Sequence, residues 1–354
     1  MYAERSRNGR PPGPGAAIGH LLGFEYGGEC ESARLDESCY LIPRDTLCGT
    51  DSVPRFQIAG EGDILGGWVP EAYMATKAIL HPLVSPEASA PPGWPQKLAA
   101  MAEEYVLPGA SAFSAADTVA GGQDLLLEGP VRLKPVYGKG GHGQMVVTDI
   151  QALPNTVSQL SAVNAPENGF VIEANLSDVD TYTVGQSRLP RCTVSYCGTQ
   201  FLTEDNTGGP AYGGSELTAV LGGYDNLPAD ILPEEMLQAV RYAAGFDDLV
   251  DEYLPGLIAS RRNYDVACGR AHDGALRMGI IDQSRRVGGA TGAELVAAEV
   301  LVKDPDARAV RARSAEIYGD EQSVPEGALI CFQGDDPEVG PLLKCAFVEE
   351  TIAR

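Results

Sequence analysis

The chain has 354 residues, of which 44% are hydrophobic and 21% are charged, a composition typical of a globular protein with room for two or three subdomains. Its formal net charge of −23 argues against unassisted binding to nucleic acid or to an anionic membrane, because both partners are themselves negative. No stretch of about 18 apolar residues is present, so we expect no membrane-spanning helix. The N-terminal arginines lead into Pro- and Gly-rich sequence rather than an apolar signal core, so we expect a cytoplasmic protein.

Cysteine and histidine are too sparse to predict a zinc site. The eight cysteines are scattered without a Cys-x-x-Cys pair, and only four histidines occur. Disulfides are also not expected in a chain of this size for which no export signal is predicted. We therefore interpret most of the cysteines as small buried apolar side chains.

The N-terminal part of the chain carries weak signals of regular structure. Residues 1–18 contain the run RPPGPG, which breaks helices and strands, so we expect a disordered leader there. Residues 19–104 are expected to form a reduced N-terminal subdomain and linker. Its expected elements are two short strands and two helices, at Cys39–Ile42, Phe56–Ala59, Val69–Val84 and Gln96–Tyr105. Pro70 can begin the first of these helices, and Pro82 ends it.

A glycine-rich hairpin is predicted over Val131–Val147, which reads VRLKPVYGKGGHGQMVV. The turn between its two apolar runs contains Lys139, Gly140, Gly141, His142 and Gly143. Glycine N–H groups can approach an anion closely, and Lys134 on the first strand would add a positive charge. The turn lacks the G-K-[ST] ending of a Walker A loop, and the flanking strands exclude a dinucleotide fingerprint. The pattern therefore predicts either a phosphate-gripping hairpin or an ordinary Gly-rich hairpin tip.

The remaining sequence mixes predicted helices and strands. Helices are predicted at Ser114–Leu127, Ala152–Val163, Pro233–Tyr253 and Ala293–Val302. Strands are predicted at Phe170–Ala174, Thr181–Val184, Cys192–Tyr196, Arg262–Gly269 and Leu276–Gln283, followed by a hairpin of Ala328–Phe332 and Lys344–Val348. The polar, glycine-rich stretch Thr203–Gly214 is expected to be a mobile loop. Together these elements predict a fold of the α/β (α+β) class.

Two lysines and two aspartates stand out on these elements. Lys77 lies in a predicted helix and Lys134 in the hairpin, where both could supply cations for phosphates, although Lys77 is also compatible with a surface position. Asp265 and Asp282 lie on two predicted antiparallel strands. A pair of carboxylates on neighbouring strands can bind Mg²⁺, but surface positions explain these residues equally well.

Between these residues lies an apolar strand that ends in the sequence EANL, residues Glu173–Leu176. The extended backbone after such a strand could hydrogen-bond one edge of a base. Asp180 follows a few residues later and could accept hydrogen bonds from ribose hydroxyls.

In the order and spacing of these motifs, the chain resembles the ATP-grasp superfamily, which includes D-alanine–D-alanine ligase, glutathione synthetase and biotin carboxylase. The segment DQSRRVGG is similar to the superfamily's metal-binding strand E-x-N-x-R-x-G-G, with Asp282, Ser284 and Arg286 at the positions of its Glu, Asn and Arg. Aspartate is shorter than glutamate, and a serine hydroxyl is a weaker ligand than an amide oxygen. The phrases ATKAILHPL, VRLKP and GGATGAE resemble a bacterial branch whose members are sometimes labelled biotin carboxylase-like.

The resemblance implies two α+β subdomains that grip ATP, namely a lid at residues 105–176 and a metal-binding subdomain at residues 177–354. It implies ATP and Mg²⁺ as cofactors, and a carboxylate and an amine as substrates that are joined through an acyl phosphate. The implied nucleotide-binding residues are Lys77, Lys134, Lys139, Gly140, Gly141, His142, Gly143, Glu173, Ala174, Asn175, Leu176 and Asp180. The implied metal ligands are Asp265, Asp282 and Ser284, and the implied catalytic residues are Lys134 and Arg286.

Other functions stay open on the sequence alone. One is a biotin carboxylase-like enzyme that uses bicarbonate, although no biotin-acceptor motif of the Met-Lys-Met type occurs. A second is a degenerate ATP-binding regulatory protein, which the Asp and Ser replacements in the metal strand favour. A third is a Gly-rich carbohydrate-binding module. The substrates are not readable from the sequence, and a homodimer is compatible with the resemblance, because dimers are frequent among ATP-grasp relatives.

Overall fold

The computed structural model describes residues 15, 18–19, 22–25, 27, 39–138 and 143–354. The predicted leader lies largely outside these residues, and so do Lys139, Gly140, Gly141 and His142 of the glycine turn. The described chain mixes helices and sheets, which confirms the predicted α/β (α+β) class.

The strands form three sheets. Their bounds are β1 Leu47–Cys48, β2 Gly67–Val69, β3 Gly109–Ala112, β4 Val131–Pro135, β5 Met145–Val147, β6 Phe170–Ala174, β7 Ser177–Leu189, β8 Cys192–Glu204, β9 Pro210–Leu221, β10 Ile258–Ala259, β11 Arg261–Arg270, β12 Leu276–Ser284, β13 Ala307–Tyr318, β14 Leu329–Asp336 and β15 Gly340–Ala353. The large sheet has the order β12-β11-β7-β8-β9-β13-β15-β14, and every neighbouring pair in it is antiparallel. A four-stranded sheet has the order β3-β6-β4-β5, and a small sheet has the order β1-β2-β10.

Six α-helices and six short 3₁₀ helices are described. The α-helices are α2 Ser52–Phe56, α3 Gln96–Met101, α4 Ala115–Leu126, α5 Leu153–Val163, α6 Glu234–Tyr253 and α7 Thr291–Lys303. The 3₁₀ helices are η1 Glu61–Asp63, η2 Ala72–Ala75, η3 Lys77–Leu80, η4 Ala102–Glu104, η5 Pro166–Asn168 and η6 Tyr224–Asn226.

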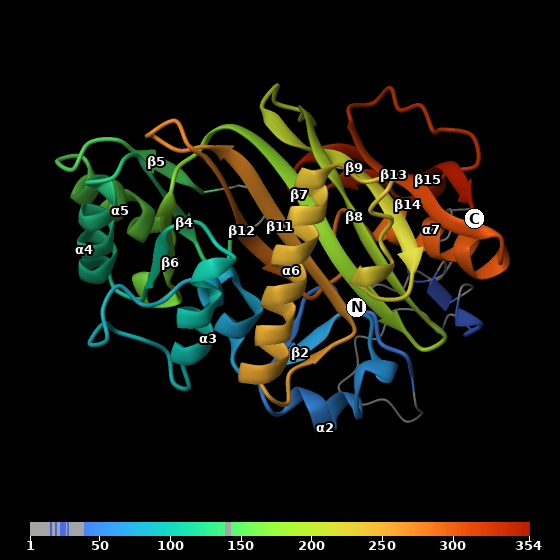
Figure 1. Ribbon diagram of the computed structural model, residues 1–354, viewed down its shortest axis with the longest axis horizontal. Helices are drawn as coiled ribbons and strands as arrows, with labels where there is room; N and C mark the ends of the chain where they lie inside the picture. The colour runs from blue at the N-terminus through green and yellow to red at the C-terminus, as the bar shows by residue number, and fades with distance from the viewer. Residues whose placement is uncertain (1–14, 16–17, 20–21, 26, 28–38, 139–142) are drawn as a thin grey trace.

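The large sheet is covered by one helix on each face. Helix α6 crosses its strands in Figure 1 and packs against β7, β11 and β12 through residues such as Phe246, Val184 and Val266. Helix α7 packs against β8, β9 and β13, and the neighbouring residues Tyr196 and Cys197 of β8 belong to the α7 and α6 cores respectively. Successive side chains of a strand point to opposite faces, so the two helices lie on opposite faces of the sheet.

The four-stranded sheet is covered by α4 and α5 on one face, as the left side of Figure 1 shows. Val131 and Leu133 of β4, with Phe170 and Ile172 of β6, form the core beneath these helices. By the strand alternation, Lys134 then faces away from α4 and α5. The sheet thereby directs this lysine toward the β11–β12 edge of the large sheet.

Most of the expected elements are present. The hairpin at Val131–Val147 is confirmed as β4 and β5, with Val131 opposite Val147 in an antiparallel pair. The helices predicted at Ser114–Leu127, Ala152–Val163 and Pro233–Tyr253 are confirmed to within a residue or two as α4, α5 and α6.

The helix predicted over Val69–Val84 is wrong. Two 3₁₀ helices, η2 and η3, occupy this stretch, and Thr76 between them is extended, with φ −114° and ψ 171°. The Thr76 side chain accepts a hydrogen bond from Ala78 N–H, and its carbonyl accepts one from the Gln283 side chain. These contacts use groups that a continuous helix would need for its own hydrogen bonds.

Three other local predictions are wrong. Phe56 ends helix α2 rather than opening a strand, since the next residue, Gln57, is left-handed, with φ 54°. Cys39–Ile42 forms an isolated bridge between Leu41 and Ile64 instead of a strand. The expected loop Thr203–Gly214 belongs mostly to β8 and β9, which a short turn joins.

That turn has a local cause. Asp205 Oδ1 accepts hydrogen bonds from Thr207 N–H at 2.8 Å and from Gly209 N–H at 2.9 Å. Short polar residues therefore close a tight turn, and the strands continue on either side of it. The strand predicted at Cys192–Tyr196 accordingly extends to 13 residues as β8, and the strand predicted at Thr181–Val184 is also longer than expected, with 13 residues in β7.

The α6 core gives a direct test of the fold. Phe246 is 0% exposed and stacks edge-on against Tyr264, whereas Leu127 is 82% exposed. We expect Phe246→Ala to lower the free energy of unfolding by about 3–5 kcal/mol, because it leaves a cavity between helix and sheet. Leu127→Ala is the matched control and should change it little. Denaturant unfolding followed by circular dichroism measures both, and equal effects would contradict the packing described.

Candidate functional site

The candidate site lies where the four-stranded sheet meets β11 and β12, the edge of the large sheet (Figure 1). Two lysines and two aspartates from four elements converge there. Lys77 comes from η3, Lys134 from β4, Asp265 from β11 and Asp282 from β12. The ion pairs of the two lysines define the site.

The Lys77 side chain is only 3% exposed and contacts two other parts of the chain. Its Nζ lies 3.2 Å from Asp282 Oδ2 and donates to the carbonyls of Gly138, at 2.7 Å, and Val136, at 3.4 Å. The extended Thr76 directs this lysine inward, since Thr76 caps η3 at the residue before it. A buried ammonium next to the start of the glycine turn is a suitable phosphate ligand.

Lys134 is also buried and forms an ion pair with Glu173 of β6. Its Nζ also lies 3.3 Å from the carbonyl of Ile281 on β12. Burial by itself raises the pKa of Glu173, but Lys134 and the neighbouring His81 lower it below its ordinary value. The Glu173 side chain is therefore an internal counter-ion of Lys134, a role that the sequence did not predict.

Asp265 and Asp282 are directly opposite each other in the antiparallel β11–β12 pair. Burial, and then the charge of Asp282, raise the pKa of Asp265 to about 7, while a hydrogen bond from Gln200 and the charges of Lys77 and Arg261 act in the opposite direction. The Gln200 Nε2 donor lies 2.6 Å from Asp265 Oδ1. Two carboxylates in this position favour a cation between them.

Ser284 is two residues beyond Asp282 on β12, and its Oγ is buried without a hydrogen-bond partner among the described residues. The described residues contain no cluster of three or more His, Cys, Asp and Glu side chains that could hold a metal ion. Two carboxylates and one free hydroxyl nevertheless suit Mg²⁺, which usually takes one or two carboxylates and completes its shell with water and phosphate oxygens. The residues present therefore fit a magnesium ion that is bound together with a phosphate ligand.

Arg286 lies just past the end of β12 and is partly exposed. Its Nε is 3.5 Å from Asp45 Oδ1, and its Nη1 donates to the Val287 carbonyl at 3.1 Å. Its own carbonyl accepts a hydrogen bond from the buried Arg261, which forms an ion pair with Glu294 of α7. This network fixes the backbone of Arg286, while its guanidinium group contacts Asp45 and the Val287 carbonyl.

The segment Glu173–Leu176, expected to hold a base, connects the two sheets. The amides of Ala174 and Asn175 already donate to the carbonyls of Pro108, at 2.8 Å, and Pro130, at 2.9 Å. Leu176 packs with Leu107 and Ala267 in a small apolar cluster. Asn175 Oδ1 accepts a hydrogen bond from Arg132 at 2.8 Å.

Two further predicted residues lie at the surface. Asp180 is exposed on β7, opposite Cys268 of β11. Gly143 is the last residue of the glycine turn and the first described residue after position 142, and it is left-handed, with φ 72°. The roles predicted for them remain predictions.

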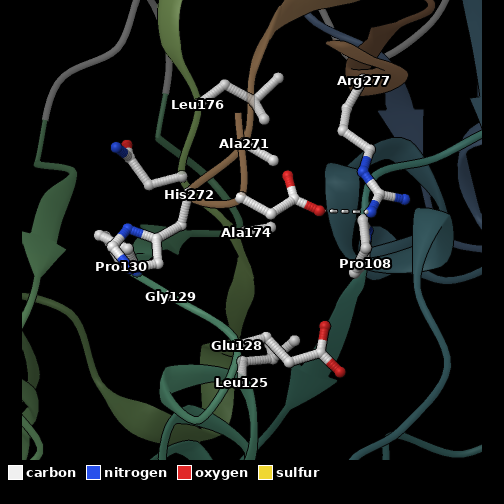
Figure 2. A pocket seen from close by; sticks show the side chains of 12 residues that line it. Pro108, Leu125, Glu128, Gly129, Pro130, Ala174, Leu176, Ala271, His272 and Arg277 are labelled. Carbon is white, nitrogen blue, oxygen red and sulfur yellow. Dashed lines mark hydrogen bonds and ion pairs between the residues drawn. The ribbon is translucent and has the colours of Figure 1, made fainter. Parts of the chain in front are cut away.

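A cavity of about 340 Å³ adjoins the same connection. Figure 2 shows its walls, which include Ala174, Leu176, Pro130 and the β11–β12 turn with His272, and the dashed line marks the ion pair of Asp273 with Arg277 at 3.4 Å. Neither Lys77, Lys134 nor the aspartates opposite each other on β11 and β12 line it. The cavity is therefore distinct from the lysine–aspartate cluster.

Sequence reasoning missed His81, Gln200 and Arg261. His81 comes from a stretch that was predicted to be helical, and Gln200 lies between the predicted strand Cys192–Tyr196 and the expected loop Thr203–Gly214, so neither carried a signal of chemistry. Arg261 precedes the predicted β11 strand, and its partner Glu294 lies 33 residues away. Only the folded chain shows that these residues face the site.

A family model described as "Protein of unknown function (DUF3182)" matches residues 14–346, and the chain belongs to this family. No curated protein matches the sequence. None of the helices in the described part of the chain is long and apolar enough to cross a membrane.

Several solved structures have a similar arrangement. A biotin carboxylase from Campylobacter jejuni matches with a TM-score of 0.48 at 10% identity, over 81% of this chain and 65% of that one. The biotin carboxylase domain of a 2-oxoglutarate carboxylase from Hydrogenobacter thermophilus, in complex with ADP, Mg²⁺ and bicarbonate, matches with a TM-score of 0.46 at 12% identity, over the same shares. A D-alanyl-alanine synthetase from Vibrio cholerae matches with a TM-score of 0.34 at 10% identity, over 51% of this chain and 50% of that one. The chain covers less than two thirds of each, and similarities this distant do not assign a function.

The pair of opposed carboxylates, Asp265 and Asp282, predicts that the stability of the metal-free protein depends on pH. Because the folded-state pKa of Asp265 is above its ordinary value of 3.8, the stability from its protonation is complete below that value and is lost as the pH rises through about 7. Asp265→Asn keeps the oxygen that accepts from Gln200 and removes the charge. We expect this variant to melt at a higher temperature than the wild type at pH 8, and the difference to become smaller as the pH is lowered to 5.

Glu103, which is exposed on η4, provides the control Glu103→Gln, which should not alter the pH dependence. Differential scanning fluorimetry in EDTA measures all three proteins. A melting temperature of Asp265→Asn below that of the wild type at pH 8 would show that the two carboxylates do not repel each other.

Proposed function

We propose that the chain is an ATP-grasp enzyme, a Mg²⁺-dependent ligase that joins a carboxylate to an amine through an acyl phosphate and releases ADP. The observation that carries this proposal is the convergence of Lys77 and Lys134 with Asp265 and Asp282 between two sheets. Cations for phosphates and carboxylates for a divalent ion are the two requirements of an ATP site. The sequence resemblance to the superfamily supports the same conclusion independently of this geometry.

In this proposal, Lys77 and Lys134 bind phosphate oxygens of ATP. The Lys77 contact with the Gly138 carbonyl supports this, because it places a buried ammonium where the glycine-rich turn of the hairpin begins. The connection from Glu173 to Leu176 would face the adenine, and Asp180 would face the ribose. We propose residues 105–176 as the lid and residues 177–354 as the metal-binding part.

Asp265 and Asp282 would hold Mg²⁺, with Ser284 as a further oxygen ligand. A magnesium ion bound there would neutralise charge that develops on the phosphates. The raised pKa of Asp265 and the unpartnered hydroxyl of Ser284 support this assignment.

The chain contributes orientation and charge neutralisation rather than a covalent nucleophile. Arg286 would hold the substrate carboxylate, one oxygen of which attacks the γ-phosphorus while ADP leaves. The amine then attacks the acyl carbon, and phosphate leaves with the electrons of the C–O bond. Closure of the lid would exclude water, which otherwise hydrolyses the acyl phosphate.

A second candidate is a regulatory protein that binds ATP without turnover. Ser284 at a metal-ligand position favours it, and so does the pairing of both lysines with carboxylates of the chain itself. Bicarbonate-dependent chemistry of the biotin carboxylase type is a third outcome, which bicarbonate-dependent release of ADP would identify.

Nucleotide binding is the first test. We expect ATP to raise the melting temperature by mass action and Mg²⁺ to increase the shift, while GTP and NAD shift it little. A shift with ATP that ignores Mg²⁺, without ADP release for any amine or acid, would favour the regulatory protein. No shift with any nucleotide would contradict the proposed site.

Point variants test the assigned residues. We expect Lys134→Ala to weaken ATP binding about 10- to 100-fold in calorimetry, because it removes a charged hydrogen bond to phosphate. The double variant Lys134→Ala/Glu173→Gln avoids leaving Glu173 buried without a cation and should show the same loss. Lys97→Ala, in α3, is the control for a general loss of positive charge and should bind as the wild type does. Unchanged affinity in both Lys134 variants would remove this lysine from the site.

Asp282→Ala separates metal binding from folding. We expect this variant to melt cooperatively and to lose the Mg²⁺-dependent part of the ATP shift. If it keeps full Mg²⁺-dependent turnover, the metal lies elsewhere.

A further inference from the structure

A buried histidine lies beside the Lys134–Glu173 ion pair. The His81 side chain is 0% exposed, and its Nε2 is 3.6 Å from Glu173 Oε2. Among the described residues, neither ring nitrogen of His81 nor Oε2 of Glu173 has a hydrogen-bond partner. Buried polar atoms without partners are costly, so three of them at one contact need a physical explanation.

The histidine ring is held in place by the backbone of β3. A Cβ at Gly109 would lie 2.7 Å from both Nδ1 and Cε1 of His81, and Gly109 is opposite Glu173 in the β3–β6 pair. The ring thus occupies the space that a side chain at position 109 would fill. The ring therefore packs directly against the backbone of β3 next to Glu173.

Few other charges face this contact. Arg132 is opposite Glu173 in the β4–β6 pair, but its guanidinium group is bound to Asn175 and Gln144. Lys77, on the helix before His81, is paired with Asp282. Lys134 and His81 are therefore the two groups that can neutralise Glu173.

We propose that His81 is a positioning residue that takes up a proton when Lys134 moves from Glu173 to a nucleotide phosphate. This inference rests on the proposed ATP site. In the nucleotide-free protein, Lys134 neutralises the buried carboxylate. A bound phosphate attracts the same ammonium group, and Glu173 would then be buried without a cation, which is strongly unfavourable.

A proton at His81 resolves this conflict. The proton comes from the solvent and binds His81 Nε2, and the resulting imidazolium donates a hydrogen bond to Glu173 Oε2. No other bond forms or breaks, and the proton returns to the solvent when the nucleotide leaves. Glu173 is then neutralised by the His81 imidazolium instead of by Lys134. Lys134 can therefore bind the phosphate without leaving Glu173 buried as an uncompensated charge.

Proton uptake is directly measurable. Calorimetric titration of the full chain with ADP at saturating Mg²⁺, in buffers that differ in ionisation enthalpy, gives the number of protons bound per nucleotide. We expect His81→Gln to take up about one proton fewer than the wild type, because an amide can bond Glu173 but cannot be protonated. Protons that exchange on the phosphates or on Asp265 occur in both proteins and cancel in the difference.

The affinity should follow the same linkage. As the pH rises, the ADP affinity of the wild type should fall by up to about tenfold more per pH unit than that of His81→Gln, because its binding takes up one more proton. His272→Gln, on the β11–β12 turn, is the matched histidine control and should keep the wild-type proton uptake. A merely structural role of His81 would alter the melting temperature without changing the proton count.

The outcomes separate the two proposals. If the wild type binds ADP, and if the wild type and His81→Gln take up the same number of protons, the role of His81 is refuted and the ATP site stands. If His81→Gln does not melt cooperatively, Glu173→Gln replaces it, and this variant should also take up about one proton fewer. If the wild type binds no nucleotide at any pH, the proposed function fails, and the role of His81 fails with it.

Discussion

Neutralisation of buried charge is the constraint on which the junction between the two sheets depends. Lys77 and Lys134 are both almost fully buried, and each is compensated by a carboxylate of the chain, Asp282 and Glu173 respectively. An isolated buried ammonium is very unfavourable, so these pairs determine how η3, β4, β6 and β12 can be placed relative to one another. The same pairs neutralise both lysines in the nucleotide-free protein. An anionic ligand must therefore compete with internal carboxylates for both lysines, and this competition links ligand binding to a redistribution of charge.

The large sheet provides the rigid part of the site. Helices α6 and α7 bury opposite faces of it. Its antiparallel strands β11 and β12 hold Asp265 and Asp282 directly opposite each other. Behind them, the buried Arg261–Glu294 pair ties the end of β12 to α7 through the carbonyl of Arg286. The four-stranded sheet meets it through the connection Glu173–Leu176, the lysine contacts and an apolar cluster in which Ala78 of η3 packs against Val171 of β6. Such an arrangement suits the proposed site, which would have to hold a metal rigidly.

The two readings of the site, ligase and regulatory ATP-binding protein, differ in chemistry more than in geometry. Both need the lysines, and only turnover needs a metal strand that supports transfer of the γ-phosphoryl group. At the proposed metal site, Asp282 and Ser284 would supply shorter and weaker ligands than the glutamate and asparagine of the pattern that the sequence resembles. The hydroxyl of Ser284, which has no hydrogen-bond partner among the described residues, and the raised pKa of Asp265 opposite Asp282 nevertheless support the proposal of a cation there.

The sequence by itself determined the fold class, the β4–β5 hairpin, helices α4, α5 and α6 and the β11–β12 pair, because these depend on local periodicity and turn chemistry. It also singled out Lys77, Lys134, Asp265 and Asp282, although not their contacts. Only the tertiary structure decided that Thr76 interrupts the helix predicted before Pro82, since the Gln283 side chain binds its carbonyl from more than 200 residues away. Likewise, His81, Glu173 and Arg261 gain their roles from burial beside partners on other strands. Burial and charge compensation depend on which segments of the chain contact each other in the fold, and the local sequence pattern does not determine those contacts.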